Sequence, residues 1–372
     1  MRVLLVYPPA RDASKPPIGM CYISSFLRQK GHQVEVLDLT ARPLSEDELQ
    51  KRVDSFHLYD CVGISAIITA YNFVKDFSRV VKKKLPDLPI IVGNALSISC
   101  PETLLKNSEV DVVVVDEGEL TTAELVERIK DRKNYRNIKG IWYKDEDGNI
   151  HSTPLRERIT DLDSLPCPDW DLFDIPTYMK HTGPYLDKGL LSGWITAVRG
   201  CPFSCGYCSR SFGQKVTARS ANNMIDEILE FKRLYNGTHF NIVDDLVMAR
   251  PKLVRDFARS LIERKVDITW VCNGRVNLVD EELYQLMSKS GCTSVGYGIE
   301  SGSQKILNNM NKGVTVEQAK RAIEITRNVG IHAGAPFMFG YVGEDRETIA
   351  DTVNFIKEMK LKTTVLFFST PY

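Results

Sequence analysis

The sequence has no excess of charge of either sign, because its 372 residues include 48 basic and 48 acidic side chains. This balance argues against bulk attraction to nucleic acid or to an anionic membrane surface. No uninterrupted apolar run approaches the roughly 20 residues that span a bilayer. The first apolar run ends at Pro8-Pro9, which is too early for a signal peptide and predicts a buried strand instead. We therefore expect a soluble, cytoplasmic protein with no membrane span.

Two further absences concern cofactors and redox state. The nine cysteines are an odd number without the spacing of a disulfide framework, which indicates a reducing compartment. No GxGxxG motif follows the first predicted strand, so a dinucleotide-binding domain would lack its phosphate loop. The sequence therefore disfavours a dinucleotide-binding domain.

Three cysteines stand in one Gly- and Pro-bearing loop at the spacing CxxxCxxC: Cys201, Cys205 and Cys208. Thiolates this close together can converge on one soft metal centre, and they are the ligands of iron–sulfur clusters. No fourth cysteine lies nearby, so a [4Fe-4S] cluster held here would keep one iron free of protein ligand. A three-thiolate zinc site is the alternative, and it is disfavoured because structural zinc takes four protein ligands.

Residues 1–135 alternate short apolar runs with helix-like segments, which predicts an α/β domain with a doubly wound, Rossmann-like parallel sheet. Ligands of such sheets bind beyond the carboxyl ends of the strands. The residues there are small or acidic: Pro8, Ser65, Gly93, Asn94, Glu117, Gly118 and Glu119. Taken singly, the small residues are explained by tight turns; taken together, they favour a ligand pocket.

Residues 136–193 predict a hairpin followed by an interdomain linker rich in Pro and Gly. From 194 to 372 the alternation resumes, with expected strands at 194–198, 240–243, 269–272, 295–299, 335–339 and 365–368. Six strand–helix units indicate a partial (β/α)6 barrel with its active site at the carboxyl ends of the strands. The cysteine loop follows the first of these strands. Asp280 and Thr315 precede helices and are predicted to be N-caps.

The cysteine loop and the string Gly298-Ile299-Glu300-Ser301-Gly302 resemble motifs of the radical SAM superfamily. In that family three cysteines hold a [4Fe-4S] cluster whose free iron binds S-adenosylmethionine (SAM). The resemblance implies that these residues contact SAM: Tyr207, Asp244, Asp245, Arg275, Glu300, Ser301 and Gly340. The aspartates would replace a Gly-Gly-Glu-like motif at the methionine amino group, and Arg275 would bind the methionine carboxylate.

The N-terminal half resembles the cobalamin-binding domain that precedes many radical SAM cores. The strand-end residues named above would then bind cobalamin. Pro16 stands where methyl-carrier relatives have the histidine of a DxHxxG motif, so that motif would supply no ligand to cobalt. Methylthiotransferases of the superfamily hold a second cluster with three N-terminal cysteines, and this chain has Cys21, Cys61 and Cys100 in that half. The cysteines of those enzymes lie at strand ends, whereas Cys61 starts a predicted strand, so ordinary burial explains it better.

The resemblance implies formation of a 5′-deoxyadenosyl radical and cobalamin-dependent methylation of an unactivated carbon. An external electron donor such as flavodoxin or ferredoxin would be required. An oxidative cyclisation or rearrangement without methyl transfer is the first alternative, and a non-catalytic cobalamin- or cluster-binding module is the second. Relatives tend to continue beyond a Pro-Tyr pair like Pro371-Tyr372, so we expect a truncated C-terminus. The substrate is left open.

Overall fold

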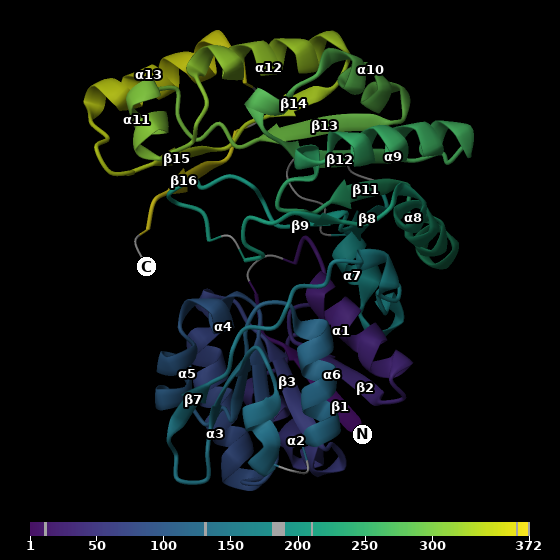
Figure 1. Cartoon of the computed structure of the whole chain (residues 1–372), viewed down its shortest axis with the longest axis vertical. Coiled ribbons are helices and arrows are strands. Elements are labelled where there is room, and N and C mark those ends of the chain that lie inside the picture. The colour runs from purple at the N-terminus through teal and green to yellow at the C-terminus, as the bar shows by residue number, and fades with distance from the viewer. Residues whose placement is uncertain (11–12, 130–131, 181–189, 210, 362–363, 371–372) are drawn as a thin grey trace. The chain divides into compact units, whose positions relative to one another are not determined.

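The computed structural model describes residues 1–10, 13–129, 132–180, 190–209, 211–361 and 364–370 (Figure 1). The chain divides into two compact units. The first comprises Met1–Ile159 and Ser164–Gly183, and the second comprises Thr160–Asp163 and Pro184–Tyr372. Within the described ranges, no helix combines the length and the apolar character that crossing a membrane requires. Pro371 and Tyr372 lie outside the described residues.

The first unit is built on a seven-stranded sheet in the order β2-β1-β3-β4-β5-β6-β7. Strands β1 to β5 are parallel. Their bounds are β1 (Arg2–Tyr7), β2 (Gln33–Asp38), β3 (Cys61–Ser65), β4 (Ile90–Gly93) and β5 (Val112–Val114). The order reverses between β1 and β3, and this is the switch point at which doubly wound sheets bind ligands. The predicted Rossmann-like sheet is confirmed.

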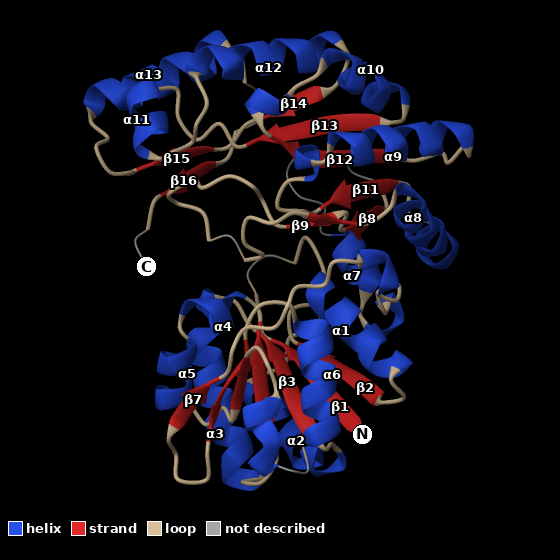
Figure 2. Ribbon diagram, in the orientation of Figure 1, coloured by secondary structure: helices blue, strands red, loops and turns tan. Residues whose placement is uncertain are grey.

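Helices cover both faces of this sheet (Figure 2). They are α1 (Ile18–Gln29), α2 (Glu46–Val53), α3 (Tyr71–Lys84), α4 (Ala95–Ser99), α5 (Pro101–Asn107) and α6 (Gly118–Arg128). The short helix α7 (Ile175–Lys180) also belongs to this unit. One apolar core joins Leu4 and Val6 of β1 to Phe77 of α3 and Leu104 of α5. Because successive strand side chains point to opposite faces, Leu5 lies on the other face of the sheet.

The predicted hairpin is present as β6 (Ile141–Lys144) and β7 (Ile150–Ser152), which pair antiparallel. Its turn is held by Asp145, whose carboxylate accepts bonds from the amides of Asp147 and Asn149. We placed this hairpin between the two domains. The structure instead pairs β6 with β5, so the hairpin extends the N-terminal sheet.

The second unit contains a five-stranded parallel sheet in the order β14-β13-β12-β11-β8. The strands are β8 (Ser192–Ile195), β11 (His239–Ile242), β12 (Thr269–Gly274), β13 (Cys292–Tyr297) and β14 (His332–Gly334). The helices are α8 (Ala221–Tyr235), α9 (Pro251–Glu263), α10 (Glu281–Lys289), α11 (Gln304–Asn309), α12 (Val316–Asn328) and α13 (Arg346–Glu358). Each strand is added beside its predecessor, as in a barrel.

The strand expected at 335–339 is divided. The chain forms β14, is interrupted at Ala335-Pro336, and continues as β15 (Phe337–Phe339), which pairs in parallel with β16 (Leu366–Phe368). Proline cannot donate to a ladder, so it breaks the strand. A bridge between Glu300 and Phe337 connects β15 to the segment that follows β13.

Both predicted N-caps of this unit are confirmed, since the side chain of Asp280 accepts from Leu283 and that of Thr315 accepts from Gln318. Replacing the cap oxygen of Thr315 by Thr315→Ala should lower the free energy of unfolding by about 1 kcal/mol. Denaturant titration measures the change. Thr315→Ser keeps the oxygen and should stay close to wild type, and equal losses in both variants would contradict the capping role.

Candidate functional site

The cysteine loop lies between two short antiparallel strands, β9 (Val198–Arg199) and β10 (Thr217–Ala218). Inside it, the amide of Cys201 donates to the carbonyl of Gly213 at 3.1 Å, and that of Cys208 donates to Cys205 at 3.1 Å. Gly200 has a φ of +93°, and a Cβ there would lie 2.4 Å from the carbonyl oxygen of Lys215. Only glycine fits this close turn.

A second segment supports the loop from the far end of α11. The amide of Gly206 donates to the carbonyl of Met310 at 2.8 Å. The side-chain amide of Asn311 donates to the carbonyl of Ser204 at 3.0 Å. The turn after α11 therefore fixes the middle of the cysteine loop.

The three cysteines differ in exposure, since Cys205 is buried, Cys201 is half-buried and Cys208 is exposed. Burial raises the pKa of the Cys201 thiol, and the charges of Cys208 and Cys205 raise it further. The three sulfurs therefore lie near enough to interact. Within the described ranges, no three His, Cys, Asp or Glu side chains are arranged to hold a single metal ion. A donor set of three thiolates on one loop fits a cluster, which binds each thiolate at a different iron.

Glu300 lies at the centre of a buried polar group after β13. It has a φ of +71°. Its carboxylate oxygen Oε1 accepts from the hydroxyl of Tyr207 at 2.9 Å and lies 3.2 Å from Nζ of Lys312. Burial raises the pKa of Tyr207, and the negative charge of Glu300 adds to this effect. The structure thus brings together two of the predicted SAM-contacting residues, Tyr207 and Glu300.

Lys312 is the member of this group that the sequence analysis missed. Its Nζ donates to the Tyr207 hydroxyl at 2.5 Å, and its side chain is only 6% exposed. The residue stands in a polar turn, Asn311-Lys312-Gly313, which has the composition of any exposed loop. The one available signal was its short distance along the chain from Glu300.

Arg275 follows β12 and makes different contacts from those expected. Its Nη1 donates to the sulfur of Cys205 at 3.4 Å, its Nη2 donates to the carbonyl of Lys312, and its Nε donates to Asn277 at 3.1 Å. Each nitrogen of the guanidinium is therefore already engaged within the protein. In this structure the hydrogen bonds of Arg275 go to Cys205, Lys312 and Asn277, and its assignment to the methionine carboxylate stays a prediction.

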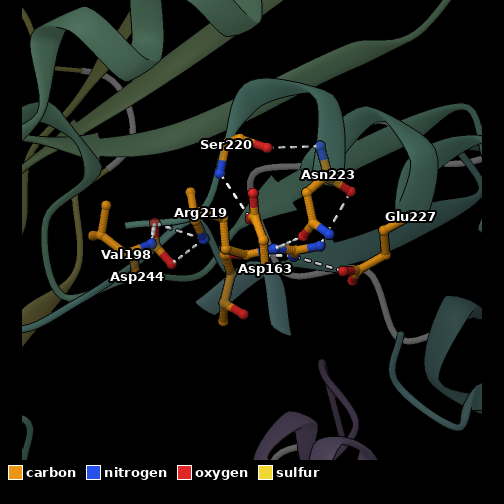
Figure 3. Close-up of polar contacts among 9 residues, drawn as sticks. Asp163, Val198, Arg219, Ser220, Asn223, Glu227 and Asp244 are labelled. Carbon is orange, nitrogen blue, oxygen red and sulfur yellow. Dashed lines mark hydrogen bonds and ion pairs between the residues drawn. The ribbon is translucent and has the colours of Figure 1, made fainter. Parts of the chain in front are cut away.

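The two aspartates after β11 also depart from the expectation. The carboxylate of Asp244 accepts from the amides of Ala197 at 2.8 Å and Val198 at 3.0 Å (Figure 3). Asp245 accepts from the amide of Gly200 at 2.8 Å. Burial raises the pKa of Asp244 to about 8, against these amide bonds, which favour the charged form. Both residues hold the base of the cysteine loop in this structure, and their assignment to the amino group of SAM stays a prediction.

Ser301 and Gly340 both make hydrogen bonds within the protein. The Ser301 hydroxyl lies 3.1 Å from that of Thr352 in α13 and accepts from the amide of Ser303. The Gly340 amide donates to the carboxylate of Glu344, and its φ of +80° suits a turn that glycine allows. These contacts anchor the chain around β15, and the predicted contacts of both residues with SAM stay predictions.

A buried ion pair supports the chain just beyond β10. Nη1 of Arg219 lies 2.6 Å from Oε2 of Glu227, and the side chains are 5% and 3% exposed (Figure 3). The same guanidinium donates to Asn223 and to the carbonyl of Thr196. The amide of Ser220 donates to Asp163 at 2.9 Å. This network ties α8 to the end of β8.

The predicted cobalamin-binding residues lie at the carboxyl ends of β1, β3, β4 and β5, but they divide into two kinds. Ser65, Gly93 and Asn94 form an open group: Asn94 donates to Ser65 at 3.1 Å, and a Cβ at Gly93 would meet no atom within 4 Å. Pro8 follows β1 at the switch point. This group offers room for a ligand at the expected edge.

Glu117, Gly118 and Glu119 are packed into the protein. Oε2 of Glu117 accepts from the amide of Ile159 at 2.6 Å. A Cβ at Gly118 would lie 2.8 Å from the side chain of Ile23 in α1. Glu119 is 4% exposed. Their contacts serve the packing of α6, so the open group is the part of the prediction that fits a cofactor.

Cys61, named above for a second cluster, is fully buried, and burial raises its pKa to about 12.

Comparison with known proteins agrees with both halves of this arrangement. The model of the radical SAM superfamily matches residues 195–356, and that of the B12 binding domain matches residues 12–126. Over its whole length the chain is 30% identical to an uncharacterized methyltransferase of Pyrococcus horikoshii, of which it covers 81%. The chain belongs to the radical SAM family with a B12-binding domain. Enzymes of this cobalamin-dependent family use a [4Fe-4S] cluster and SAM.

Two other matches also cover nearly the whole chain. The chain is 29% identical to the anaerobic magnesium-protoporphyrin IX monomethyl ester cyclase of Rubrivivax gelatinosus, over 96% of the chain and 66% of the cyclase. The radical SAM methyltransferase TsrM of Kitasatospora setae, solved with cobalamin and a [4Fe-4S] cluster, superposes with a TM-score of 0.81. That match covers 99% of this chain and 72% of TsrM at 20% identity, so it shows the fold alone.

The contribution of the buried ion pair to the stability of the fold can be tested directly. Glu227→Gln removes the anion that lies 2.6 Å from the buried Arg219 guanidinium and should lower the free energy of unfolding by about 3 kcal/mol. Glu230→Gln is the matched control in the same helix, because its partner Arg233 is 66% exposed, and it should cost less than about 1 kcal/mol. Denaturant titration compares the two, and losses of equal size would contradict the structural role of the pair.

Proposed function

We propose that this protein is a radical SAM enzyme that transfers a methyl group to an unactivated carbon. When bound, the cofactors supply an electron, a 5′-deoxyadenosyl radical that abstracts hydrogen, and a methyl group carried on cobalamin. The observation that carries the proposal is the convergence of the cysteine loop with the polar group of Glu300, Tyr207 and Lys312. The resemblance to a methyltransferase over the whole chain supports the choice of reaction.

The cysteine loop supplies the donors for the cluster. Cys201, Cys205 and Cys208 each provide one thiolate, and together they leave one iron of four for an exogenous ligand. Metal binding requires deprotonated thiols. The hydrogen bond from Arg275 and the burial of Cys205 hold that sulfur in a fixed, dry position.

Glu300 and Lys312 are the groups that we assign to the methionine part of SAM. They place a carboxylate and an ammonium 3.2 Å apart in a buried position. An amino acid carries the complementary pair, so its ammonium can bind Glu300 and its carboxylate can bind Lys312. Tyr207, bonded to both, orients them. This assignment differs from the predicted one to Asp244, Asp245 and Arg275, which bond to the cysteine loop and its base.

The open group in the first unit, Ser65, Gly93 and Asn94, is proposed to receive cobalamin. The residues present fit binding at the sheet edge, where small side chains let a large ligand approach the backbone. Pro16 has no imidazole, so the DxHxxG position supplies no ligand to cobalt. An external protein such as flavodoxin or ferredoxin is proposed as the electron donor.

A second candidate is an oxidative cyclisation, which the 29% identity to the protoporphyrin ester cyclase over 96% of the chain favours. The two reactions differ in what becomes of SAM. Methyl transfer through cobalamin consumes SAM as a methyl source as well as a radical source, whereas cyclisation needs only the radical.

Cys205→Ala should abolish the reconstituted cluster, because two thiolates on a short loop cannot hold it. Iron analysis and the visible absorption of the anaerobically reconstituted protein measure the loss. Cys100→Ala is the matched control, since Cys100 is half-buried in the first unit and should leave the iron content unchanged. A normal iron content in Cys205→Ala would contradict the ligand assignment.

Products formed without added substrate separate the two reactions. The protein loaded with cluster and cobalamin is incubated anaerobically with SAM and a strong reductant, and nucleosides are measured by mass spectrometry. A methyltransferase should yield S-adenosylhomocysteine as well as 5′-deoxyadenosine. Deoxyadenosine alone would favour the cyclase. Release of neither product would contradict the proposed enzymatic activity and leave a binding module as the better description.

A further inference from the structure

Arg275 makes a hydrogen bond to one of the three cysteines of the loop. Its Nη1 donates to the sulfur of Cys205 at 3.4 Å, and the two residues are 6% and 8% exposed. The guanidinium carbon lies 3.7 Å from the ring centroid of Phe203, a residue of the same loop. A full positive charge is thus buried against the Cys205 sulfur, with the ring face of Phe203 covering it.

The guanidinium is oriented by two further bonds. Nε donates to Oδ1 of Asn277 in η7 (Val276–Leu278), and Nη2 donates to the carbonyl of Lys312. The nearby ion pair of Lys312 with Glu300 contributes one charge of each sign. The positive charge of Arg275 is therefore not offset by that pair, and it is directed at Cys205.

We propose that Arg275 is a positioning and electrostatic residue that raises the reduction potential of the cluster through its charged hydrogen bond to the Cys205 sulfur. The inference rests on the proposed function, because it requires the cluster to be held by the cysteine loop. In the step concerned, one electron from an external reductant converts the oxidised cluster to the reduced cluster. No bond within the protein is formed or broken.

The physical reason is the change in charge on reduction. The added electron increases the negative charge on the ligand sulfurs, and hydrogen bonds to those sulfurs are among the factors that set cluster potentials. Arginine stays protonated throughout, and its attraction for the added charge is weakly screened where water is excluded. Removing the charge should therefore make the cluster harder to reduce.

Redox titration of the reconstituted cluster, followed by electron paramagnetic resonance in the absence of SAM, tests this. At a fixed potential, Arg275→Gln should lower the ratio of reduced to oxidised cluster about tenfold, equivalent to a shift of about 59 mV to more negative values for one electron. Asn277→Ala keeps the charge but loses the orienting bond, and it should shift the potential in the same direction by less. Asn277 is exposed, so its replacement should preserve the fold.

Arg264→Gln is the matched control. It removes one positive charge from the same unit, from a residue paired with Asp226 at 3.0 Å. Arg264 follows α9 and precedes β12. It therefore lies at the amino ends of the strands, whereas the cysteine loop lies at their carboxyl ends, and the reduction potential of the cluster should not change. SAM affinity, measured by equilibrium dialysis, separates the roles further: Lys312→Met should lose SAM binding, whereas Arg275→Gln should largely retain it.

The outcomes are distinct. An unchanged potential in Arg275→Gln would overturn the inference while the proposed function stands. If Arg275→Gln takes up no iron, Asn277→Ala decides, and an unchanged potential in that variant overturns the inference. A SAM-binding defect in Arg275→Gln without a shift in potential would return the residue to the methionine carboxylate. A wild-type protein that forms no cluster would refute the proposed function itself.

Discussion

The site depends on carboxylates that hold the backbone at the base of the cysteine loop. Asp244 and Asp245 accept bonds from Ala197, Val198 and Gly200, which lie where the chain leaves β8 and enters the loop. The loop has little regular structure between β9 and β10, so these contacts fix its direction. Leaving such amides buried without an acceptor would cost about 1–3 kcal/mol for each group. The loop is thus positioned by the end of the neighbouring strand.

Two buried cations, Arg275 and Lys312, lie beside this loop together with acidic side chains, in a chain that is neutral as a whole. Arg275 contacts the sulfur of Cys205, and Lys312 contacts Tyr207 and Glu300. A cluster bound by three thiolates is anionic in sum, and buried anions are stable only when they are paired or hydrogen-bonded. The two cations reach the loop from different segments, one after β12 and one after α11, so only the folded unit brings them together.

The fold could be predicted from the sequence because its signals are local. Short apolar runs alternating with helices gave the parallel sheets, and side-chain chemistry gave the caps at Asp280 and Thr315. The break in the strand at Pro336 could also have been predicted, because proline cannot donate a hydrogen bond to a neighbouring strand. We predicted one continuous strand there because the residues from Ala335 to Phe339 are mostly apolar. The cysteine spacing similarly marked the loop. The hairpin itself was predicted correctly. Its pairing with β5 joins segments that are distant in the sequence, and the local sequence does not specify that pairing.

The roles of individual side chains were harder to predict, because position at a strand end does not determine direction. Asp244, Asp245 and Arg275 lie at the expected strand ends but bond to the protein, and Lys312 belongs to no motif that would have identified it.

The central claim, that three cysteines leave one iron open to SAM, is tested most directly by Mössbauer spectroscopy of protein reconstituted with ⁵⁷Fe. Adding SAM should change the isomer shift of one iron in four. A spectrum that SAM leaves unchanged would contradict the account.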